Sequence, residues 1–415
     1  MRKVKLLGSV AIIGIVLSTN SVFAQVTSGG DVTPPGISAG AGATTSTSDN
    51  VIIGSGGGVG SVNTNNITIE NSSTLQVNQL AAPNGAGFDG ARVTVGSNFG
   101  EGSLTIQSGG TLTIDNTNGA TTGGAHLQIS DVSDADAPSL QGVVTVNNGT
   151  IDVDSVGGNS LLSVGRDGTG TLNISNGSTI NIDSTAEAGI QVGGGGTTSP
   201  QTATQGTMTV SGNSQIAITG GAGDAFLSVG RAGSNTSTLD VTGGSDIVIS
   251  SSSGSSGVTI GRSGATGIAT VDGAGSTITV GDGLNVGRGT GNGTLNIDNG
   301  GSVTNTAGSG LTRVGRSGGT GVVNVRTGST LSATDLRLGS DSGSEGTVSV
   351  NGASTVNVDQ KIQVGRESTG TLNVGDDPGT GPVETSGTVN GKSLVVGHRH
   401  DRDRDGQRQR GHRSG

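Results

Sequence analysis

The stretch Leu162–Ile182, LSVGRDGTGTLNISNGSTINI, decides the fold, because its three parts return along most of the chain. The first part ends in Val-Gly-Arg, the second reads Gly-Thr-Leu-Asn-Ile, and the third follows a glycine turn and reads Ser-Thr-Ile. Self-similarity at a period of about 20 to 50 residues is typical of repeat architectures, in which each unit stacks on its neighbours. The Val-Gly-Arg element or a close variant ends at Arg166, Arg231, Arg262, Arg288, Arg316 and Arg366.

Apolar and polar side chains alternate strictly within each unit. In the Gly-Thr-Leu-Asn-Ile part, Leu172 and Ile174 fall on one face of an extended strand, while Thr171 and Asn173 fall on the other. One face is therefore expected in a core and the other in water. Eight further segments keep this register: Ser103–Ile106, Val144–Val146, Thr207–Val210, Thr238–Val241, Thr294–Ile297, Val323–Val325, Val348–Val350 and Thr371–Val374.

Each unit contains a third short strand after its glycine turn, as in Ser178–Ile182, Ser276–Val280 and Ser354–Val358. Three strands separated by Gly, Asn, Ser and Asp corners are what one coil of a parallel β-helix needs. We therefore predict an all-β fold, a right-handed parallel β-helix of about a dozen coils. With ~4.8 Å per coil, the rod would be on the order of 55 Å long.

The composition fits a thin rod better than a wide globular core. The 415 residues include 82 glycines, 29% hydrophobic residues and 1% aromatic residues. Low hydrophobicity also fits a disordered chain, but the periodic placement of the aliphatic residues favours the repeat. Each fully buried aliphatic side chain contributes about 1.5 to 3 kcal/mol, so one coil is expected to fold only when neighbours cover both of its sides.

The first 24 residues resemble an export signal, with Arg2, Lys3 and Lys5 followed by the apolar run Leu6–Leu17 and by small residues before Gln25. A membrane anchor is the alternative, but the run is short for a bilayer core of ~30 Å. We expect residues 1–24 to be a cleaved signal peptide and the mature chain to contain no transmembrane segment. Without cysteine, its stability must come from hydrogen bonds and stacking.

The mature chain is expected to consist of a Gly/Ser/Thr-rich segment, 25–50, a solenoid domain, 51–397, and a basic tail, 398–415. The whole chain has a net charge of −10. Since the signal and the tail each carry +3, the body between them has a net charge of −16. Such an acidic body, with Phe88, Phe99 and Phe226 as its only aromatic residues, lacks the basic groove and stacking platforms of nucleic-acid binders. Nucleic acid is not an expected partner.

Residues suited to catalysis or metal binding are few. His126 is the only histidine outside the tail, and we interpret it as a solvated loop residue rather than a member of a Ser-His-Asp triad. Asp131, Asp134 and Asp136 could bind calcium, but they lack the spacing of an EF-hand, which favours an exposed acidic loop. The stretch Gly220–Asp224 resembles the calcium-binding nonapeptide of toxin repeats, but it occurs once and with a shortened spacing, whereas that fold needs several copies in tandem. We therefore predict no catalytic, metal or cofactor-binding residue, no cofactor, and no enzyme activity.

The recurrent arginines form one charged column, for which two interpretations are open. They could line up to bind anionic glycans, or they could sit at a corner of each coil and pair with nearby Asp, Glu or carbonyl oxygens. The acidic body favours the second interpretation. Longer inserts are expected to protrude from the rod and to carry any recognition of host or cell-surface glycans or proteins: Gly119–Gly124, Asp131–Gln141, Gly193–Gln205 and Ser250–Gly257.

The pattern Val-Gly-Arg-x-Gly-x-Gly-Thr-Leu-Asn-Ile-x-x-Gly-Ser resembles the repeat associated with type V secretion (autotransporter) passengers and with PEP-CTERM proteins. The resemblance covers roughly Val51 to Val396 and implies a secreted or surface-exposed bacterial β-solenoid, without implying a catalytic mechanism. Complete members of these classes carry a C-terminal β-barrel or an apolar sorting helix, and this sequence shows the pattern of neither.

The tail suggests a reason for that difference. With one permitted codon chosen for each residue from His398 to Ser414, reading one nucleotide later gives TGTTGTGTVNVNAATGA, another coil of the repeat. We predict that the tail is a frameshift product and that repeat coding continues in the shifted frame. The alternative is a genuine basic tail for an anionic surface.

These observations lead to one expected function and two alternatives. The expected function is that of a non-enzymatic, exported passenger or stalk for surface display or adhesion, truncated before its secretion module. It would lie at the cell surface or outer membrane, or outside the cell, if such a module existed, and otherwise in the periplasm. The alternatives are a β-helical polysaccharide-active enzyme and a nonfunctional frameshift product.

Overall fold

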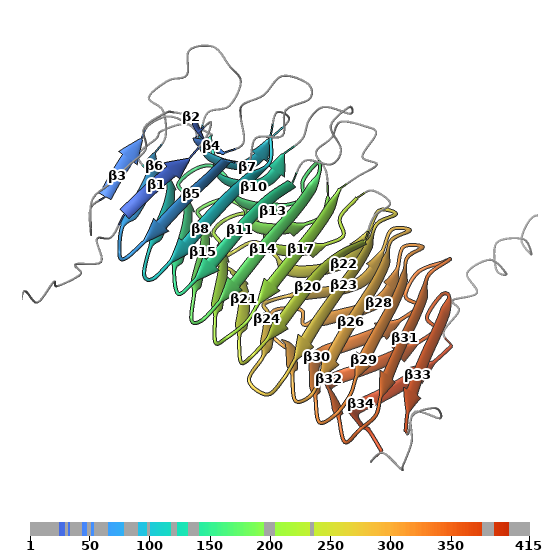
Figure 1. Cartoon of the computed structure of the whole chain (residues 1–415). Helices are drawn as coiled ribbons and strands as arrows, with labels where there is room; N and C mark the ends of the chain where they lie inside the picture. The colour runs from blue at the N-terminus through green and yellow to red at the C-terminus, as the bar shows by residue number, and fades with distance from the viewer. Residues whose placement is uncertain are drawn as a thin grey trace, which may run out of the picture.

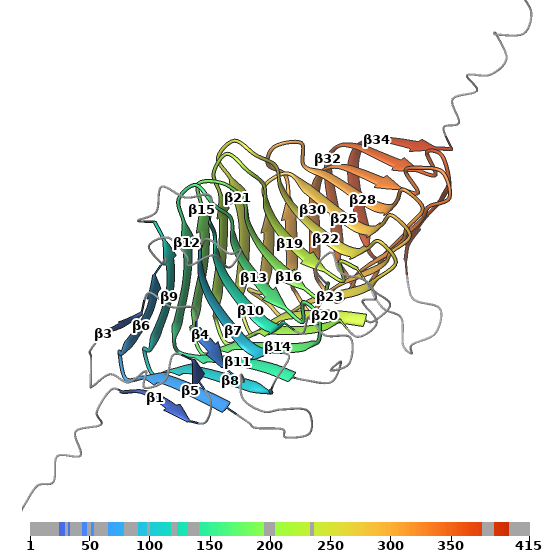
Figure 2. The same cartoon turned by 90° about the horizontal axis from the view of Figure 1, so that it is seen from above.

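The strands wind into a parallel β-helix, as the sequence predicted (Figures 1 and 2). The predicted signal peptide 1–24 and tail 398–415 lie outside the residues that the structure describes. The computed structural model describes residues 25–29, 32–33, 44–47, 51–53, 65–78, 90–97, 100–117, 123–131, 141–194, 204–232, 236–375 and 386–397.

Each full coil contributes one strand to each of three faces, and strands on a face pair in parallel with those of the neighbouring coils. Face 1 contains β5 (Asn65–Glu70), β8 (Gly102–Gln107), β11 (Gln141–Asn147), β14 (Thr169–Ser175), β17 (Gln205–Val210), β20 (Thr236–Thr242), β23 (Thr266–Asp272), β26 (Asn292–Asp298), β29 (Thr320–Val325), β31 (Glu345–Val350) and β33 (Thr369–Val374). These eleven strands define eleven coils, or a rod of roughly 50 Å at the usual strand spacing.

The other two faces belong to one continuous sheet. Face 2 contains β3 (Thr44–Thr47), β6 (Thr74–Asn78), β9 (Thr111–Asn116), β12 (Thr150–Ser155), β15 (Thr179–Ser184), β18 (Gln215–Gly220), β21 (Asp246–Ser251), β24 (Thr277–Val280) and β27 (Ser302–Asn305). Face 3 contains β4 (Val51–Ile53), β7 (Ala91–Ser97), β10 (Ala125–Asp131), β13 (Ser160–Val164), β16 (Ala188–Val192), β19 (Ala225–Val229), β22 (Ser256–Arg262), β25 (Gly283–Arg288) and β28 (Leu311–Arg316).

The last three coils differ from the prediction of three separate strands. There the second and third strands run together as β30 (Thr330–Leu338), β32 (Thr355–Val364) and β34 (Thr388–Val396). The pairing of β30 with β32 shifts register between Ala333 and Asp335, where the chain passes from face 2 to face 3. These coils lack the residues that form a separate turn elsewhere, so a local irregularity within one strand makes the corner instead.

Aliphatic side chains stack in columns inside the rod. Leu172 pairs in register with Met208, and Ile174 with Val210, and all four side chains are fully buried or nearly so. Thr171 and Asn173, by contrast, point outward, as the alternation predicted. The core is thus one continuous cluster along the rod, and no coil buries its aliphatic face alone.

Two short strands pair antiparallel at the N-terminal end. β1 (Gln25–Gly29) pairs with β5, and β2 (Val32–Thr33) pairs with β4. β1 occupies the outer edge of face 1, where hydrogen-bonding groups would otherwise be open to another chain. Segment 25–50 therefore contributes strands that cover one end of the rod.

The expected insert at Ser250–Gly257 is not a long loop. Four residues, 252–255, separate β21 from β22, and they hydrogen-bond to the coil before them. The Ser252 and Ser253 amides donate to the Gly220 and Gly221 carbonyls, and the Ser251 hydroxyl donates to the Gly223 carbonyl at 2.9 Å. We interpreted this run of serines as an irregular connection, but it forms a compact corner whose amides and hydroxyl groups hydrogen-bond to the preceding coil. The other three expected inserts fall largely on residues 118–122, 132–140 and 195–203, outside the described residues.

A residue with positive φ turns the chain at the end of the face 3 strands from β7 to β28, and it is glycine in all of them except β10, where it is Ser130. Gly287, which precedes Arg288, has a φ of 74°, and a Cβ atom there would overlap the carbonyl oxygen of Thr320 in the next coil. Gly289 has a φ of 53° but open space around its Cα. Gly289 therefore needs only the left-handed backbone conformation, whereas Gly287 needs that conformation and also the absence of a side chain.

We expect Gly289→Ala to lower the free energy of unfolding by about 1 kcal/mol, the cost of the left-handed conformation for an L-residue. Gly287→Ala should cost about 3 kcal/mol or more, because the methyl group also pushes apart two coils. Urea unfolding followed by circular dichroism measures both. Equal losses in the two variants would contradict the close approach.

A buried column of serines stabilises the corner between faces 1 and 2. The Ser214 hydroxyl accepts a hydrogen bond from the Ser178 amide at 3.2 Å and donates to the Ser211 carbonyl at 2.6 Å. The Ser245 hydroxyl accepts from the Ser214 amide at 3.1 Å in the same way. These three serines of consecutive coils are fully buried. Each hydroxyl satisfies a backbone group that water cannot reach.

Ser214→Ala should therefore lower the free energy of unfolding by about 1 to 3 kcal/mol, since it leaves a buried amide and a buried carbonyl without partners. Ser253→Ala is the matched control, because its hydroxyl donates to the Gly221 carbonyl at an exposed position. We expect little change there. A loss of the same size in both variants would contradict the role of burial.

Candidate functional site

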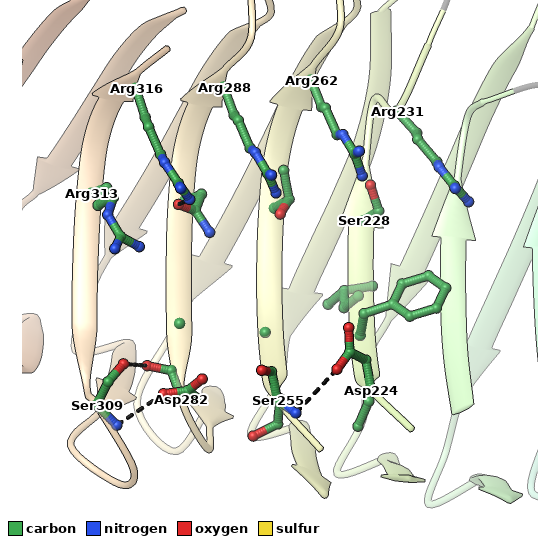
Figure 3. A pocket seen from close by; sticks show the side chains of 18 of the residues that line it. Asp224, Ser228, Arg231, Ser255, Arg262, Asp282, Arg288, Ser309, Arg313 and Arg316 are labelled. Atoms are coloured by element: carbon green, nitrogen blue, oxygen red, sulfur yellow. Dashed lines mark hydrogen bonds between the residues drawn. The ribbon is translucent and has the colours of Figure 1, made fainter. Parts of the chain in front are cut away.

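Each Val-Gly-Arg element places one arginine at the same corner of its coil. Arg262 pairs in register with Arg288, and Arg288 with Arg316. Adjacent strands lie ~4.8 Å apart, so the backbones of these arginines follow one another at that spacing. Figure 3 shows the side chains of Arg231, Arg262, Arg288 and Arg316 pointing the same way over face 3. The repeat has thus built a row of cations along the rod.

The row is uninterrupted over four coils. In the coil before Arg231, Gly194 follows the turn glycine, and in the coil after Arg316, Ser340 does so. Arg166 and Arg366 stand beyond these gaps. The four-coil run is therefore the longest continuous part of the column.

A groove of about 440 Å³ lies on face 3 beneath this run. One edge is formed by the arginine row and the other by acidic and hydroxyl residues at the corner between faces 2 and 3, as Figure 3 shows. The floor comes from the outward positions of β19, β22, β25 and β28. Charged, polar and aromatic side chains line the groove, among them Glu187, Asp224, Phe226, Arg231, Ser255, Arg262, Asp282, Asn285, Arg288, Ser309, Arg313 and Arg316.

Ion pairs form at the arginines outside the run and at Arg316, the last arginine of the run, as the sequence interpretation favoured. Arg166 lies 3.9 Å from Asp131 and 3.7 Å from Asp167. Arg316 lies 3.8 Å from Asp341, and its guanidinium also donates to the Asn285 amide oxygen at 3.4 Å. Pairing thus explains the arginines that have an acidic partner in the same or an adjacent coil, as it also does for Arg366 beside Glu367.

The other three arginines of the run do not follow that interpretation. Arg231, Arg262 and Arg288 form no ion pair with any residue that the structure describes. Burial, followed by the charges of Arg262 and Arg316, lowers the pKa of Arg288 below its usual value. Burial and Arg262 also lower the pKa of Arg231, and the charge of Glu187 opposes that shift. Cations are therefore crowded here without matching anions.

Arg313 is a fifth cation in the groove, which the sequence analysis did not single out. It occupies an outward position of β28, next to Arg337 of β30 in register. Burial, then the charges of Arg316 and Arg337, lower the pKa of Arg313 to about 10, against the effect of Asp341. The alternation in Leu-Thr-Arg-Val-Gly-Arg could have revealed it, because a residue two before the turn glycine points to the same side as the floor.

The acidic edge is held in place by the backbone of neighbouring coils. The Asp224 carboxylate accepts a hydrogen bond from the Ser255 amide at 3.1 Å, and the Asp282 carboxylate accepts one from the Ser309 amide at 2.8 Å. Burial and the charge of Asp224 raise the pKa of Glu187. Asp224, which ends the glycine-rich stretch 220–224, thus caps a turn and faces the groove.

Phe226 is the only aromatic residue among those that the structure describes. It pairs in register with Gly189 in the preceding coil, and a Cβ atom on that glycine would overlap the ring. The far end of the ring therefore lies over the backbone of β16. This arrangement gives the acidic end of the groove an apolar platform.

A second polar cluster lies on face 3 nearer the N-terminus. His126 pairs in register with Arg92. With its amide oriented to match its neighbours, Gln128 donates to Asp131 at 2.7 Å and accepts from Arg166 at 2.6 Å. Burial, then the charges of Arg92 and Arg166, lower the pKa of His126 to about 4. The interpretation of His126 as a solvated loop residue is therefore wrong, since it lies half-buried in β10 beside two cations.

The cluster contains one of the three aspartates considered for calcium. Asp131 ends β10 and pairs with Arg166, whereas Asp134 and Asp136 lie outside the described residues. Within the described ranges, no three His, Asp or Glu side chains are grouped so that they could hold a metal ion.

The pKa of His126 predicts a pH dependence. In the unfolded chain the pKa is about 6.5, so above that pH the imidazole is neutral in both states. As the pH falls from about 6.5 to about 4, the unfolded chain binds a proton that the folded chain does not bind, and stability is lost. Wild type should lose stability relative to His126→Gln across this window. Urea unfolding at several pH values checks this, and parallel curves would contradict it.

Comparison with protein-family models, with curated proteins and with solved structures finds no match to this chain. Among the described residues, no helix is long and apolar enough to cross a membrane.

Proposed function

We propose that the chain is a non-enzymatic, exported β-solenoid that acts as a passenger or stalk for surface display or adhesion, and that it binds an anionic ligand in the arginine-lined groove. The observation that carries this proposal is the run of four arginines at one edge of a groove on a regular rod. Three of them form no ion pair with a residue that the structure describes. A stacked rod holds such a row at constant spacing. Uncompensated cations in a chain of net charge −10 favour a binding role.

Export is supported by the sequence of residues 1–24 and by the resemblance of the repeat to autotransporter passengers and PEP-CTERM-associated solenoids. The location would be the cell surface, the outer membrane or the outside of the cell, or otherwise the periplasm. The inserts of the N-terminal half offer a second set of contacts, to host or cell-surface glycans or proteins.

The state of the acidic residues supports binding over catalysis. Asp224 and Asp282 accept hydrogen bonds from backbone amides of the next coil. Both side chains therefore already cap turns, which a structural role explains. A polysaccharide-active enzyme is the competing function, and it would need carboxylates of this edge to take part in proton transfer.

Two measurements test the proposal. Antibody against the solenoid should stain intact cells that express the gene, and beads coated with the purified chain should adhere to cell surfaces in a manner that soluble chain inhibits. Periplasmic proteins of known location are the control for intact cells. Absence of staining together with absence of adhesion would contradict a role in display. Shortened glycan chains after incubation with the purified chain would favour the enzyme.

A further inference from the structure

We propose that the groove binds an extended acidic polysaccharide along the rod axis, with its anionic groups on the arginine row and its hydroxyl groups toward the acidic edge. This inference rests on the proposed binding function and names its ligand class.

The spacing favours a polymer over a small anion. Arg231, Arg262, Arg288 and Arg316 come from four consecutive coils, so their backbones span roughly 15 Å in steps of ~4.8 Å. A single phosphate or acetate would contact one or two guanidinium groups. An extended chain of pyranose rings advances by about one coil for each ring, so the anionic groups of one polymer can reach several arginines of the row at once.

The free cations lie where such a chain would pass. Arg262 and Arg288 occupy the middle of the run, and neither forms an ion pair with a described residue. Arg313 points into the groove from β28 and adds a cation below the row. Bound anions would relieve the mutual repulsion of these side chains, and a guanidinium can hold a carboxylate or sulfate with two hydrogen bonds.

The acidic edge favours a polysaccharide over a nucleic acid. Glu187, Asp224 and Asp282 repel a second row of negative charges, which a nucleic acid would bring, but they accept hydrogen bonds from hydroxyl groups. Ser255 and Ser309 line the same edge. A sugar ring carries an anionic group on one side and hydroxyl groups on others, so it can satisfy both edges at once.

Phe226 adds an apolar contact for a sugar ring to the groove. Its ring lies against Gly189 at the N-terminal end of the run and offers an apolar surface for the C–H face of one sugar ring. Only one ring of the polymer would stack in this way. Recognition should therefore depend mainly on the charged edge and fall as salt is added.

The test is binding of defined oligouronates to the purified chain, measured by calorimetry at low salt. Affinity should rise with oligomer length up to about four sugar rings, the number of coils in the run, and then level off. Methyl-esterified oligomers, which keep the rings but lack the charge, should not bind. A sulfated oligosaccharide of the same length shows whether carboxylate or sulfate is preferred.

Arg262→Gln combined with Arg288→Gln should weaken oligouronate binding at least tenfold and reduce its salt dependence. Arg326→Gln combined with Arg366→Gln is the matched control. It removes the same charge from arginines that pair with Asp298 and Glu367 and do not line the groove. Circular dichroism of each variant confirms that the solenoid is intact. Phe226→Leu should weaken binding by a smaller factor.

Three outcomes would overturn the proposal: equal binding by wild type and the groove variant, affinity that does not depend on oligomer length, or tighter binding of single-stranded DNA than of an oligouronate. Loss of oligouronate binding in the groove variant with unchanged bead adhesion would show that the groove binds the polysaccharide and that other surfaces mediate adhesion. No oligouronate binding by wild type, with adhesion intact, would overturn only the ligand class.

Discussion

Mutual coverage of aliphatic columns is the constraint on which the rest of the structure depends. A coil buries its Leu, Ile and Val side chains only against the coils on either side, and the hydrogen bonds of its strands also run to those neighbours. Register is therefore fixed at every step, because a slip by one residue would turn each core side chain outward. Since the interior is this thin, every corner must turn within a few residues.

The corner requirement explains why the most repeated sequence element is also the element that makes the groove. Gly287 and its counterparts turn the chain where the backbone of the next coil comes too close for a Cβ atom. The residue after the glycine leaves the strand at the edge of face 3, where a long side chain can reach back over the outer surface (Figure 3). An arginine placed there in one coil is placed identically in the next, so a small local motif becomes a linear array.

Much of this fold could be predicted from the sequence, because alternation and turn chemistry are local. The inward positions of Leu172 and Ile174 and the polar outward positions of Thr171 and Asn173 follow directly from the period of a strand. The fusion of two strands in β30 and the compact corner at 252–255 do not, because they depend on how the neighbouring coil satisfies the backbone.

The candidate site was harder to predict, since a cation's environment is set by residues distant in sequence. His126 lies in a glycine-rich stretch that suggests a loop, yet pairing with β7 brings Arg92 beside it. Arg166 and Arg288 carry the same motif, but only Arg166 meets aspartates, one of them next in sequence and the other from the coil before. Sequence periodicity identifies the column, and only the structure separates its paired members from its free ones.

That separation also decides between the two interpretations of the arginines. If the column existed only to stabilise corners, each arginine would be expected to meet an acceptor, because a partly buried cation without one costs free energy. The arginines of the run instead crowd one another. Burial is the main cause of the lowered pKa values of Arg288 and Arg313, and the charges of neighbouring arginines add to it. The acidic residues that could neutralise them stand on the opposite edge, bound to backbone amides. Two charged edges held apart by a rigid sheet leave space between them for a ligand that carries anions on one side and hydrogen-bond donors on the other.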